Sequence, residues 1–260
     1  KAYTDQDINE IKGSIEFKNV SFKYPGAEEY ALKDVNLKVG AGQNAAIVGR
    51  TGSGKTTLIE LVPRLFDVTE GEILVDGKNI ESIPLQILRE SIGLVPQDTF
   101  LFSDTIGENI AFGTNNASEE EIEEAAEKAQ VRDNILEFDK KFETILGERG
   151  ITLSGGQKQR TAIARALIRD PKIIILDDSL SAVDTKTEEA ILQHLRKELK
   201  GRTTLMISHR ISTIKDADII YYLEDGTVVE QGTHEELLEQ EGRYSVMYNK
   251  QLIEQELAEI

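Results

Sequence analysis

Alternation of apolar and polar residues predicts half-buried strands over Ile15–Phe22 and Ala31–Val39. Gln43–Val48 has the make-up of a short buried strand, and Ile173–Leu176 is a continuous apolar run typical of a central strand buried on both faces. Four further strands are predicted on the same grounds over Glu72–Val75, Thr204–Ile207, Ile219–Leu223 and Thr227–Glu230. The last two strands flank Asp225-Gly226, a pair typical of a hairpin turn.

Capping signals and helical periodicity predict helices between these strands. Capping boxes, in which Ser or Thr precedes Glu by three residues, occur at Ser118 and at Thr233. Ser154 is expected to begin a helix that ends before Asp170-Pro171. The predicted helices before the Thr233 box cover residues 55–65, 118–130, 154–169 and 185–200.

The order of these elements predicts an α/β fold. Strands come first, and strands then alternate with helices, which indicates an antiparallel β part joined to an α/β core. Residues 82–157 are richer in helix and are expected to form an inserted subdomain. The expected domain covers residues 13–245, with a linker to a missing membrane domain over 1–12 and a helical tail over 246–260.

Composition narrows the function. The formal net charge of −17 argues against nucleic acid as the main partner, because phosphate neutralisation needs clustered Lys and Arg. The chain has no cysteine, which excludes a disulfide scaffold and a thiolate metal site. Its longest apolar runs are about five residues, against the roughly 20 that a membrane span needs.

Gly49-Arg50-Thr51-Gly52-Ser53-Gly54-Lys55-Thr56 matches the phosphate-binding pattern G-x-x-x-x-G-K-[ST], and it lies between a predicted strand and a predicted helix. Loop and helix N–H groups in such a motif point inward and favour negative charge. Lys55 is expected to reach the β- and γ-phosphates of ATP, and the Thr56 hydroxyl to bind Mg²⁺. Asp177 ends an apolar strand, where a carboxylate completes the Mg²⁺ site of such enzymes. The predicted nucleotide-binding residues here are Gly49, Thr51, Gly52, Ser53, Gly54, Lys55, Thr56 and Thr57.

Leu153-Ser154-Gly155-Gly156-Gln157 is identical to the signature sequence of the ABC ATPases, and the chain therefore resembles that family. The resemblance implies a P-loop ABC ATPase core with an antiparallel β subdomain and an inserted α-helical subdomain. It also implies that Tyr24 stacks on adenine, that Gln97 contacts Mg²⁺ or the attacking water, and that His209 contacts the γ-phosphate. Residues implied to act on the ATP of a second subunit are Ser154, Gly155, Gly156, Gln157 and Asp184.

The family resemblance also implies partners. Two such domains would enclose two ATP molecules head to tail, and a transmembrane domain would hold them at the cytoplasmic face of a membrane. Gly147-Glu148-Arg149-Gly150 and Phe100–Ile110 resemble the corresponding loops of exporters. A soluble ABC ATPase without a transport role is a further alternative. His194 and His234 are expected to take no part in chemistry.

Asp178 departs from the family pattern, in which Glu follows the Mg²⁺-binding Asp and polarises the attacking water. The carboxylate is kept but is one methylene shorter, and a shift of about 1 Å in water position can lower a rate about 100-fold. Two interpretations follow. Asp178 either orients water in an active homodimer, or marks a degenerate site that mainly regulates a catalytic partner.

Overall fold

The computed structural model describes residues 8–114, 116–147, 152–178 and 185–258. The chain divides into two compact units. Unit 1 contains residues 1–89 and 201–260, and unit 2 contains residues 90–200.

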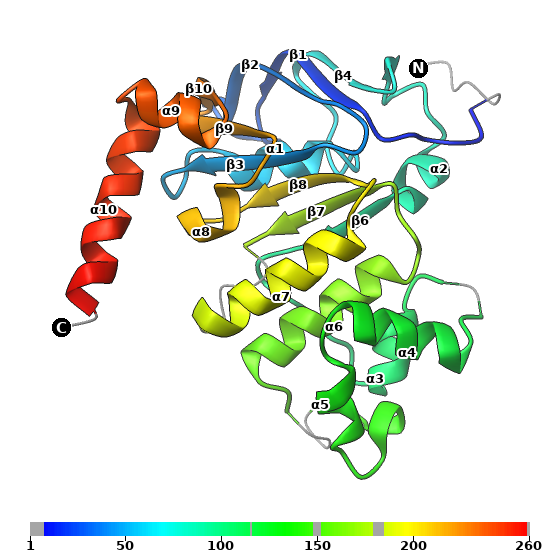
Figure 1. The fold of residues 1–260 in the computed structure, drawn as a ribbon. Coiled ribbons are helices and arrows are strands. Elements are labelled where there is room, and N and C mark those ends of the chain that lie inside the picture. The colour runs from blue at the N-terminus through cyan, green and yellow to red at the C-terminus, as the bar shows by residue number, and fades with distance from the viewer. Residues whose placement is uncertain (1–7, 115, 148–151, 179–184, 259–260) are drawn as a thin grey trace. The chain divides into compact units, whose positions relative to one another are not determined.

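Unit 1 contains two groups of strands (Figure 1). The first group comprises β1 (Ile15–Phe22), β2 (Leu32–Val39), β4 (Glu70–Val75) and β5 (Lys78–Asn79). These strands pair antiparallel in the order β2-β1-β4-β5. The second group comprises β3 (Asn44–Gly49), β8 (Thr203–Ile207), β9 (Ile219–Glu224) and β10 (Thr227–Gly232). Here β3 runs parallel to β8 and to β9, and β10 is antiparallel to β9.

Five helices accompany these strands: α1 (Lys55–Leu61), α2 (Leu85–Glu90), α8 (Ile211–Ile214), α9 (His234–Glu239) and α10 (Arg243–Ala258). A cluster of buried side chains joins β3, β9, α8, α9 and the start of α10, and it includes Val48, Ile214, Leu237 and the fully buried Tyr244. Burial of this apolar surface holds α8 and the first turns of α10 on the strands of unit 1.

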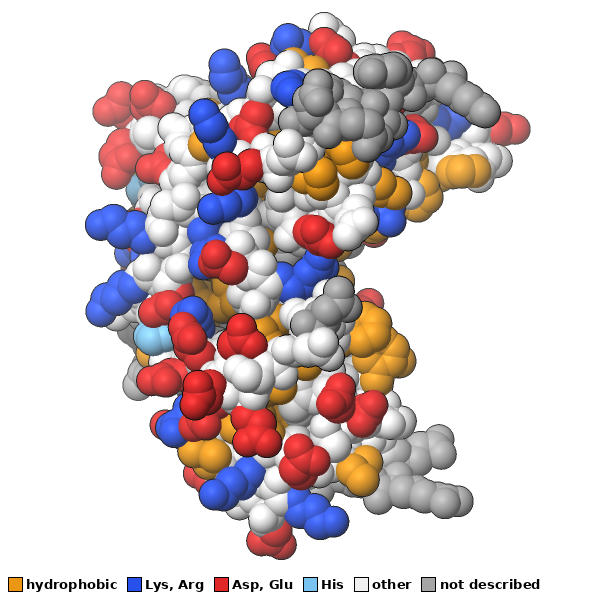
Figure 2. Space-filling view, turned by 90° about the vertical axis from the view of Figure 1, so that its right-hand side faces the viewer, with side chains coloured by type: hydrophobic (Ala, Val, Ile, Leu, Met, Phe, Trp, Pro, Cys, Tyr) orange, Lys and Arg blue, Asp and Glu red, His pale blue; other side chains and the backbone are white. Residues whose placement is uncertain are grey.

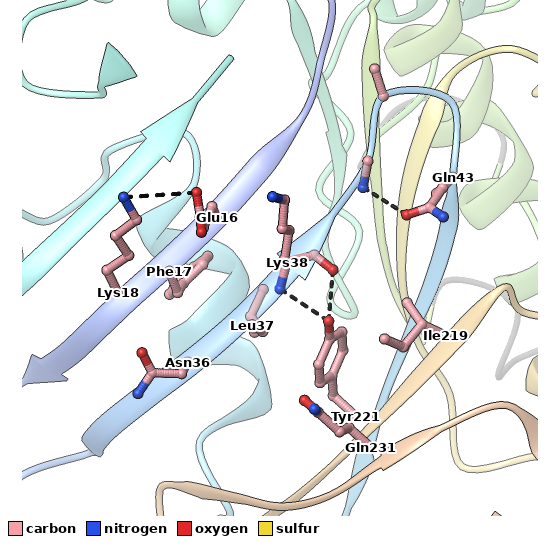
Figure 3. A pocket seen from close by; sticks show the side chains of 12 residues that line it. Glu16, Phe17, Lys18, Asn36, Leu37, Lys38, Gln43, Ile219, Tyr221 and Gln231 are labelled. Atoms are coloured by element: carbon pink, nitrogen blue, oxygen red, sulfur yellow. Dashed lines mark hydrogen bonds and ion pairs between the residues drawn. The ribbon is translucent and has the colours of Figure 1, made fainter. Parts of the chain in front are cut away.

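Tyr221 of β9 links the two groups of strands in unit 1. Its side chain is 2% exposed, and its hydroxyl donates to the Lys38 carbonyl oxygen at 2.6 Å while accepting from the Lys38 N–H at 3.0 Å. Figure 3 shows the phenol directed at the main chain of Lys38, beside a groove of about 720 Å³. The hydroxyl thus satisfies both polar main-chain groups of an edge-strand residue that has no strand partner on that side.

The β9–β10 turn makes a second link. The Gly226 N–H donates to the Ser53 carbonyl oxygen at 3.0 Å, and the Gly226 carbonyl oxygen accepts from the Lys33 N–H at 2.8 Å. Gly226 has φ 78°, and a Cβ atom there would lie 2.5 Å from the Ala31 carbonyl oxygen. Only glycine fits this close approach without displacing the main chain.

Unit 2 is mainly helical. Its elements are β6 (Ile92–Val95), α3 (Ile106–Ala111), α4 (Glu119–Lys128), α5 (Arg132–Leu136), a 3₁₀ turn (Lys141–Glu143), α6 (Gly155–Leu167), β7 (Ile173–Asp177) and α7 (Thr185–Glu198). Strands β6 and β7 are parallel, and α6 contacts β6, α3 and α4. All residues of β7 are buried, as the continuous apolar run predicts.

The fold class is confirmed, and most elements lie where the sequence predicts them. Both capping boxes form, because the hydroxyls of Ser118 and Thr233 accept from the N–H groups of Glu121 and Glu236. One predicted helix end is wrong, because α1 stops at Leu61 rather than at residue 65. Pro63 lacks an N–H and cannot continue the helical hydrogen bonding, and the chain turns away through the positive φ of the next residue.

Acidic side chains are spread over the face shown in Figure 2, among Lys and Arg and a few groups of apolar side chains. Helix α4 contributes several of the exposed glutamates of unit 2, including Glu119, Glu120 and Glu124. Among the residues that the structure describes, no helix has both the length and the apolar character needed to cross a bilayer.

Candidate nucleotide-binding site

The phosphate-binding loop connects β3 to α1 in unit 1. Gly49 ends β3 with φ 151°, and a Cβ atom there would lie 2.2 Å from the Leu223 carbonyl oxygen, so the loop begins where only glycine fits. Gly54 is the N-cap of α1 and has a left-handed conformation. As a glycine it has no side chain that could cap the helix. The first-turn N–H groups of a helix have no partner within it and carry the positive end of its dipole. This helix start therefore suits an anion.

Lys55 folds back over the loop. Its side chain is buried, at 7% exposure, and its Nζ donates to the carbonyl oxygens of Gly49 at 2.9 Å and of Arg50 at 2.8 Å. The same loop contains Ser53, whose Oγ is buried and makes no hydrogen bond to the described residues. A buried cation and an unsatisfied hydroxyl in one short loop fit an anionic ligand, because the cation favours negative charge and the hydroxyl is costly to leave unpaired. The residues present thus fit phosphate oxygens.

Tyr24 lies beside this loop. Its hydroxyl shares a hydrogen bond of 2.8 Å with Thr57 Oγ1 and donates to Glu60 Oε2 at 3.3 Å. Its ring packs edge-on against Phe22 and Phe66, at centroid distances of 4.9 and 5.3 Å. Burial is the main cause that raises the pKa of Tyr24 above its usual value of 10.0, and Glu60 raises it further. The phenol is therefore neutral at physiological pH and is fixed next to the phosphate-binding loop.

His209 follows β8 and lies at the same end of the sheet as the loop. In the parallel register Ile47 is opposite Ile207, so Gly49 and His209 each come two residues beyond a paired position. The carboxyl ends of neighbouring parallel strands meet at one edge of a sheet, which is where such folds bind ligands. His209 is exposed, and its neighbour Ser208 accepts the Arg210 N–H at 3.1 Å. Unit 1 therefore brings together the predicted loop, Tyr24 and His209.

Unit 2 brings together the predicted carboxylates and Gln97. Val95 of β6 is opposite Leu176 of β7, so Gln97 and Asp178 each lie two residues beyond that pair. Asp177 is 3% exposed, whereas Asp178 is half-buried and Gln97 is exposed. Asp178 has φ 43°, a left-handed conformation that Asp adopts more readily than most non-glycine residues. At Asp178 the main chain therefore leaves the regular pleat of β7.

The signature sequence begins α6. Ser154 is the N-cap, its Oγ accepts the Gln157 N–H at 3.2 Å, and Gln157 Oε1 accepts the Ser154 N–H at 2.9 Å. Gly155 is exposed and Gly156 is half-buried in the first turn. The capping box occupies two of the N–H groups at the helix start, and the glycines leave the rest of this turn open to a close approach. Asp184 and Glu148 lie outside the described residues.

A magnesium site with the predicted ligands would take one residue from unit 1, Thr56, and two from unit 2, Asp177 and Gln97. Among the described residues, no three His, Cys, Asp or Glu side chains gather as a metal centre. That donor set fits Mg²⁺, which in nucleotide sites is held by one or two protein oxygens, by phosphates and by water. The assembly of the three ligands stays a prediction.

The two remaining histidines lie on α9 and α7. His234 Nδ1 shares a hydrogen bond of 2.7 Å with the hydroxyl of the buried Tyr244, and its ring packs against Tyr248. His194 lies on α7, with a buried Nε2 that has no partner among the described residues. The exposed Phe100 and Phe102 lie in the stretch Phe100–Ile110 that resembles an exporter loop, whereas Gln251 carries no motif that sequence reasoning could have recognised.

A glycine-rich loop between a strand and a helix, a buried lysine and two strand-end carboxyl groups define a phosphate-binding loop ATPase. Comparison with known proteins specifies the family. The family model described as ABC transporter matches residues 32–181, and the chain belongs to that family.

The relatives include flippases and an exporter. The chain is 50% identical over 245 residues to the ATP-dependent lipid A-core flippase of Salmonella paratyphi A and 49% identical to that of Escherichia coli K12; each alignment covers 94% of this chain. A solved structure of a bacterial Atm1-family ABC exporter with ATP bound matches 96% of the chain at 42% identity, with a TM-score of 0.89. The chain spans 42% of the length of these flippases and 44% of that exporter chain.

These comparisons confirm that the chain is an ATP-hydrolysing nucleotide-binding domain of the exporter type. They give no support to the alternative of a degenerate regulatory subunit based on Asp178, nor to a soluble ABC ATPase without a transport role. The family implies ATP binding.

Proposed function

We propose that the chain binds Mg-ATP, closes head to tail on a second domain of the same kind, and hydrolyses ATP to drive export by a membrane domain. The loop with its buried Lys55 and unsatisfied Ser53 is the observation that carries this proposal. The domain covers residues 13–245 in this proposal, between a linker and a helical tail, and it works at the cytoplasmic face of the membrane.

Each predicted residue has one task in the proposed reaction. Lys55 and the loop N–H groups bind the phosphates, and Asp178 orients the attacking water. His209 stabilises the γ-phosphate region. Mg²⁺, when bound, neutralises phosphate charge, and Thr56, Asp177 and Gln97 would hold it. Phosphoryl transfer needs little covalent help from protein, so positioning and charge stabilisation account for the rate.

The head-to-tail arrangement is supported by the separation of functions within one chain. The phosphate-binding loop begins α1 of unit 1, and the signature begins α6 of unit 2. The side chains of Ser154 and Gln157 bond to each other's main chain in the capping box. A ligand at the signature would therefore contact mainly the main-chain N–H groups at the start of α6. In our proposal that helix start contacts the γ-phosphate bound by the partner.

Mixing two disabled chains tests this arrangement. Lys55→Met removes the phosphate-binding cation of its own site, and Ser154→Arg places bulk at the signature that serves the partner. Each chain alone is expected to be inactive. Their mixture is expected to regain Mg-ATP turnover, because one composite site then has an intact loop and an intact signature. A mixture as inactive as its parts, with both variants folded and binding each other, contradicts the head-to-tail proposal.

Asp178 is tested by exchange of its carboxylate. Asp178→Asn keeps the size of the side chain and suits the left-handed main chain, yet cannot act on water as a carboxylate. Turnover is expected to fall about 100-fold or more, with ATP binding kept. Asp178→Glu is expected to change turnover by less than about tenfold. A tenfold or larger gain would instead show that the shorter carboxylate limits hydrolysis.

The membrane domain is proposed to dock on an aromatic surface of unit 2, defined by Phe100, Phe102 and Phe112. These side chains are 65%, 37% and 55% exposed, and Phe102 packs against the other two rings at 5.0 and 4.4 Å between centroids. Exposed aromatic groups of this size mark interaction sites.

A neighbouring cavity of about 410 Å³ supports this docking proposal. Its lining includes Thr99, Leu101, Leu146 and Leu153. The buried Thr99 Oγ1 has no partner among the described residues. Phe100→Asp is expected to leave turnover of this chain unchanged but to abolish transport by the whole transporter. Normal transport by that variant would refute the docking surface.

A further inference from the structure

The main chain around His209 lies between a strand and a short helix. Residues 208–210 join β8 to α8, and α8 is a single turn whose N-cap, Arg210, makes no side-chain cap to the helix. Ile211, the first residue of α8, therefore presents an N–H that the helix cannot satisfy. Its side chain is anchored, because Ile211 belongs to the buried cluster of unit 1.

Gln251 of α10 binds main-chain groups of this segment. Its Oε1 accepts the Ile211 N–H at 2.9 Å, and its Nε2 donates to the His209 carbonyl oxygen. One amide thus binds the main chain on both sides of Arg210, directly after the Cα atom that carries the His209 side chain. The Ile211 contact does for α8 what an N-cap side chain does for an ordinary helix.

Helix α10 is itself firmly attached over its first turns. The N–H of Tyr244 donates to Glu230 Oε2 at 3.0 Å, and the Arg243 N–H donates to the other oxygen of that carboxylate. Met247 and Tyr248 pack against the same buried cluster that contains Ile211. Gln251 is one turn further on, so these contacts fix the helix that carries its amide.

We propose that Gln251 is a positioning residue for ATP hydrolysis, which holds His209 in place through the main chain and from a helix outside the nucleotide site. This inference rests on the proposed role of His209. Loss of the amide leaves ATP binding intact but lets the His209 segment take several conformations. The variant chain is then slow in the chemical step, where misplacement of a group by about 1 Å is costly.

The test compares Gln251→Leu with Asn249→Leu, a matched change of an exposed amide on the same helix. Hydrogen exchange of the Ile211 amide is measured together with Mg-ATP turnover. Gln251→Leu is expected to accelerate Ile211 exchange and to lower kcat about 3- to 30-fold, with KM changed less than about twofold. Asn249→Leu is expected to change neither. Equal losses in both variants, or normal kcat with accelerated exchange, overturn the proposal.

Two further variants separate positioning from general destabilisation. Gln251→Glu keeps an acceptor for Ile211 but loses the donor to His209, so exchange is expected to stay slow while kcat falls. In a cycle with His209→Ala, the double variant is expected to be as slow as His209→Ala alone, within about twofold. Additive losses overturn the positioning role only. A His209→Ala chain with full turnover overturns the proposed role of His209, and the inference with it.

Discussion

The hydroxyl of Tyr221 offers a sharp test of how the unit that carries the phosphate-binding loop is held together. Tyr221→Phe deletes one oxygen and keeps the ring. The deletion removes two hydrogen bonds, of 2.6 and 3.0 Å, and leaves the N–H and carbonyl groups of Lys38 unpaired at the edge of β2. No other contact of the side chain has to change.

The magnitude follows from the number of bonds and from access to water. Each hydrogen bond contributes about 0.5–1.5 kcal/mol net, and a buried orphaned group costs about 1–3 kcal/mol. Water can reach Lys38 from the groove of about 720 Å³ beside it, which hydrates part of what is lost. We therefore expect Tyr221→Phe to lower the free energy of unfolding by about 1–2 kcal/mol, or about 2–8 °C in Tm.

Urea unfolding, followed by circular dichroism, measures this difference at constant slope m. Tyr222→Phe is the matched control, because Tyr222 is also buried and its hydroxyl makes no hydrogen bond to the described residues. The control is expected to change stability by less than about 0.5 kcal/mol. Equal losses in the two variants would refute the reasoning, since loss of any buried hydroxyl, rather than of the Lys38 contact, would then account for the effect.

Three further predictions concern the site and the pH dependence. Lys55→Met is expected to weaken Mg-ATP binding at least about tenfold, measured by titration calorimetry, because a buried charge-assisted contact is worth about 1.5–3 kcal/mol; unchanged affinity would remove Lys55 from the site. Ser154→Ala and Ser118→Ala each delete one helix cap and are expected to cost about 1 kcal/mol in urea unfolding, but only Ser154→Ala is expected to slow turnover; equal turnover would show that Ser154 is only a cap. Burial raises the pKa of Tyr244, so its contribution to stability is complete below the unfolded value near pH 10 and is lost as pH rises through the folded pKa. The unfolding free energy is thus expected to fall above about pH 10, and less steeply in Tyr244→Phe; parallel slopes would count against it.

Local signals in the sequence predicted much of this chain because their physics is local. A capping box needs only residues three apart, and the boxes at Ser118 and Thr233 form as predicted. The phosphate-binding loop is likewise a short motif between a strand and a helix. The end of α1 also has a local signal, Pro63, but the helical periodicity of the sequence continues past it and predicts too long a helix.

The contacts that the sequence could not predict join distant segments. Tyr221 and Lys38 are 183 residues apart, and Gln251 contacts main-chain groups 40 and 42 residues earlier. Neither Tyr221 nor Gln251 belongs to a sequence motif. Each binds a main-chain group that comes close only in the folded chain. The roles of Gln97, Asp178 and His209 stay predictions. The strand register shows only that these residues follow the carboxyl ends of parallel strands.

The turn at Gly226 has a consequence for how this domain responds to mutation. It fastens Ser53 of the phosphate-binding loop to Lys33 of β2 through main-chain atoms alone, so replacing either of those side chains leaves both bonds standing. A scan that removes one side chain at a time therefore passes over this support. A mutation reveals the connection only when it adds a side chain at Gly226. Tolerance of substitutions at the neighbouring positions therefore does not show that the segment is dispensable.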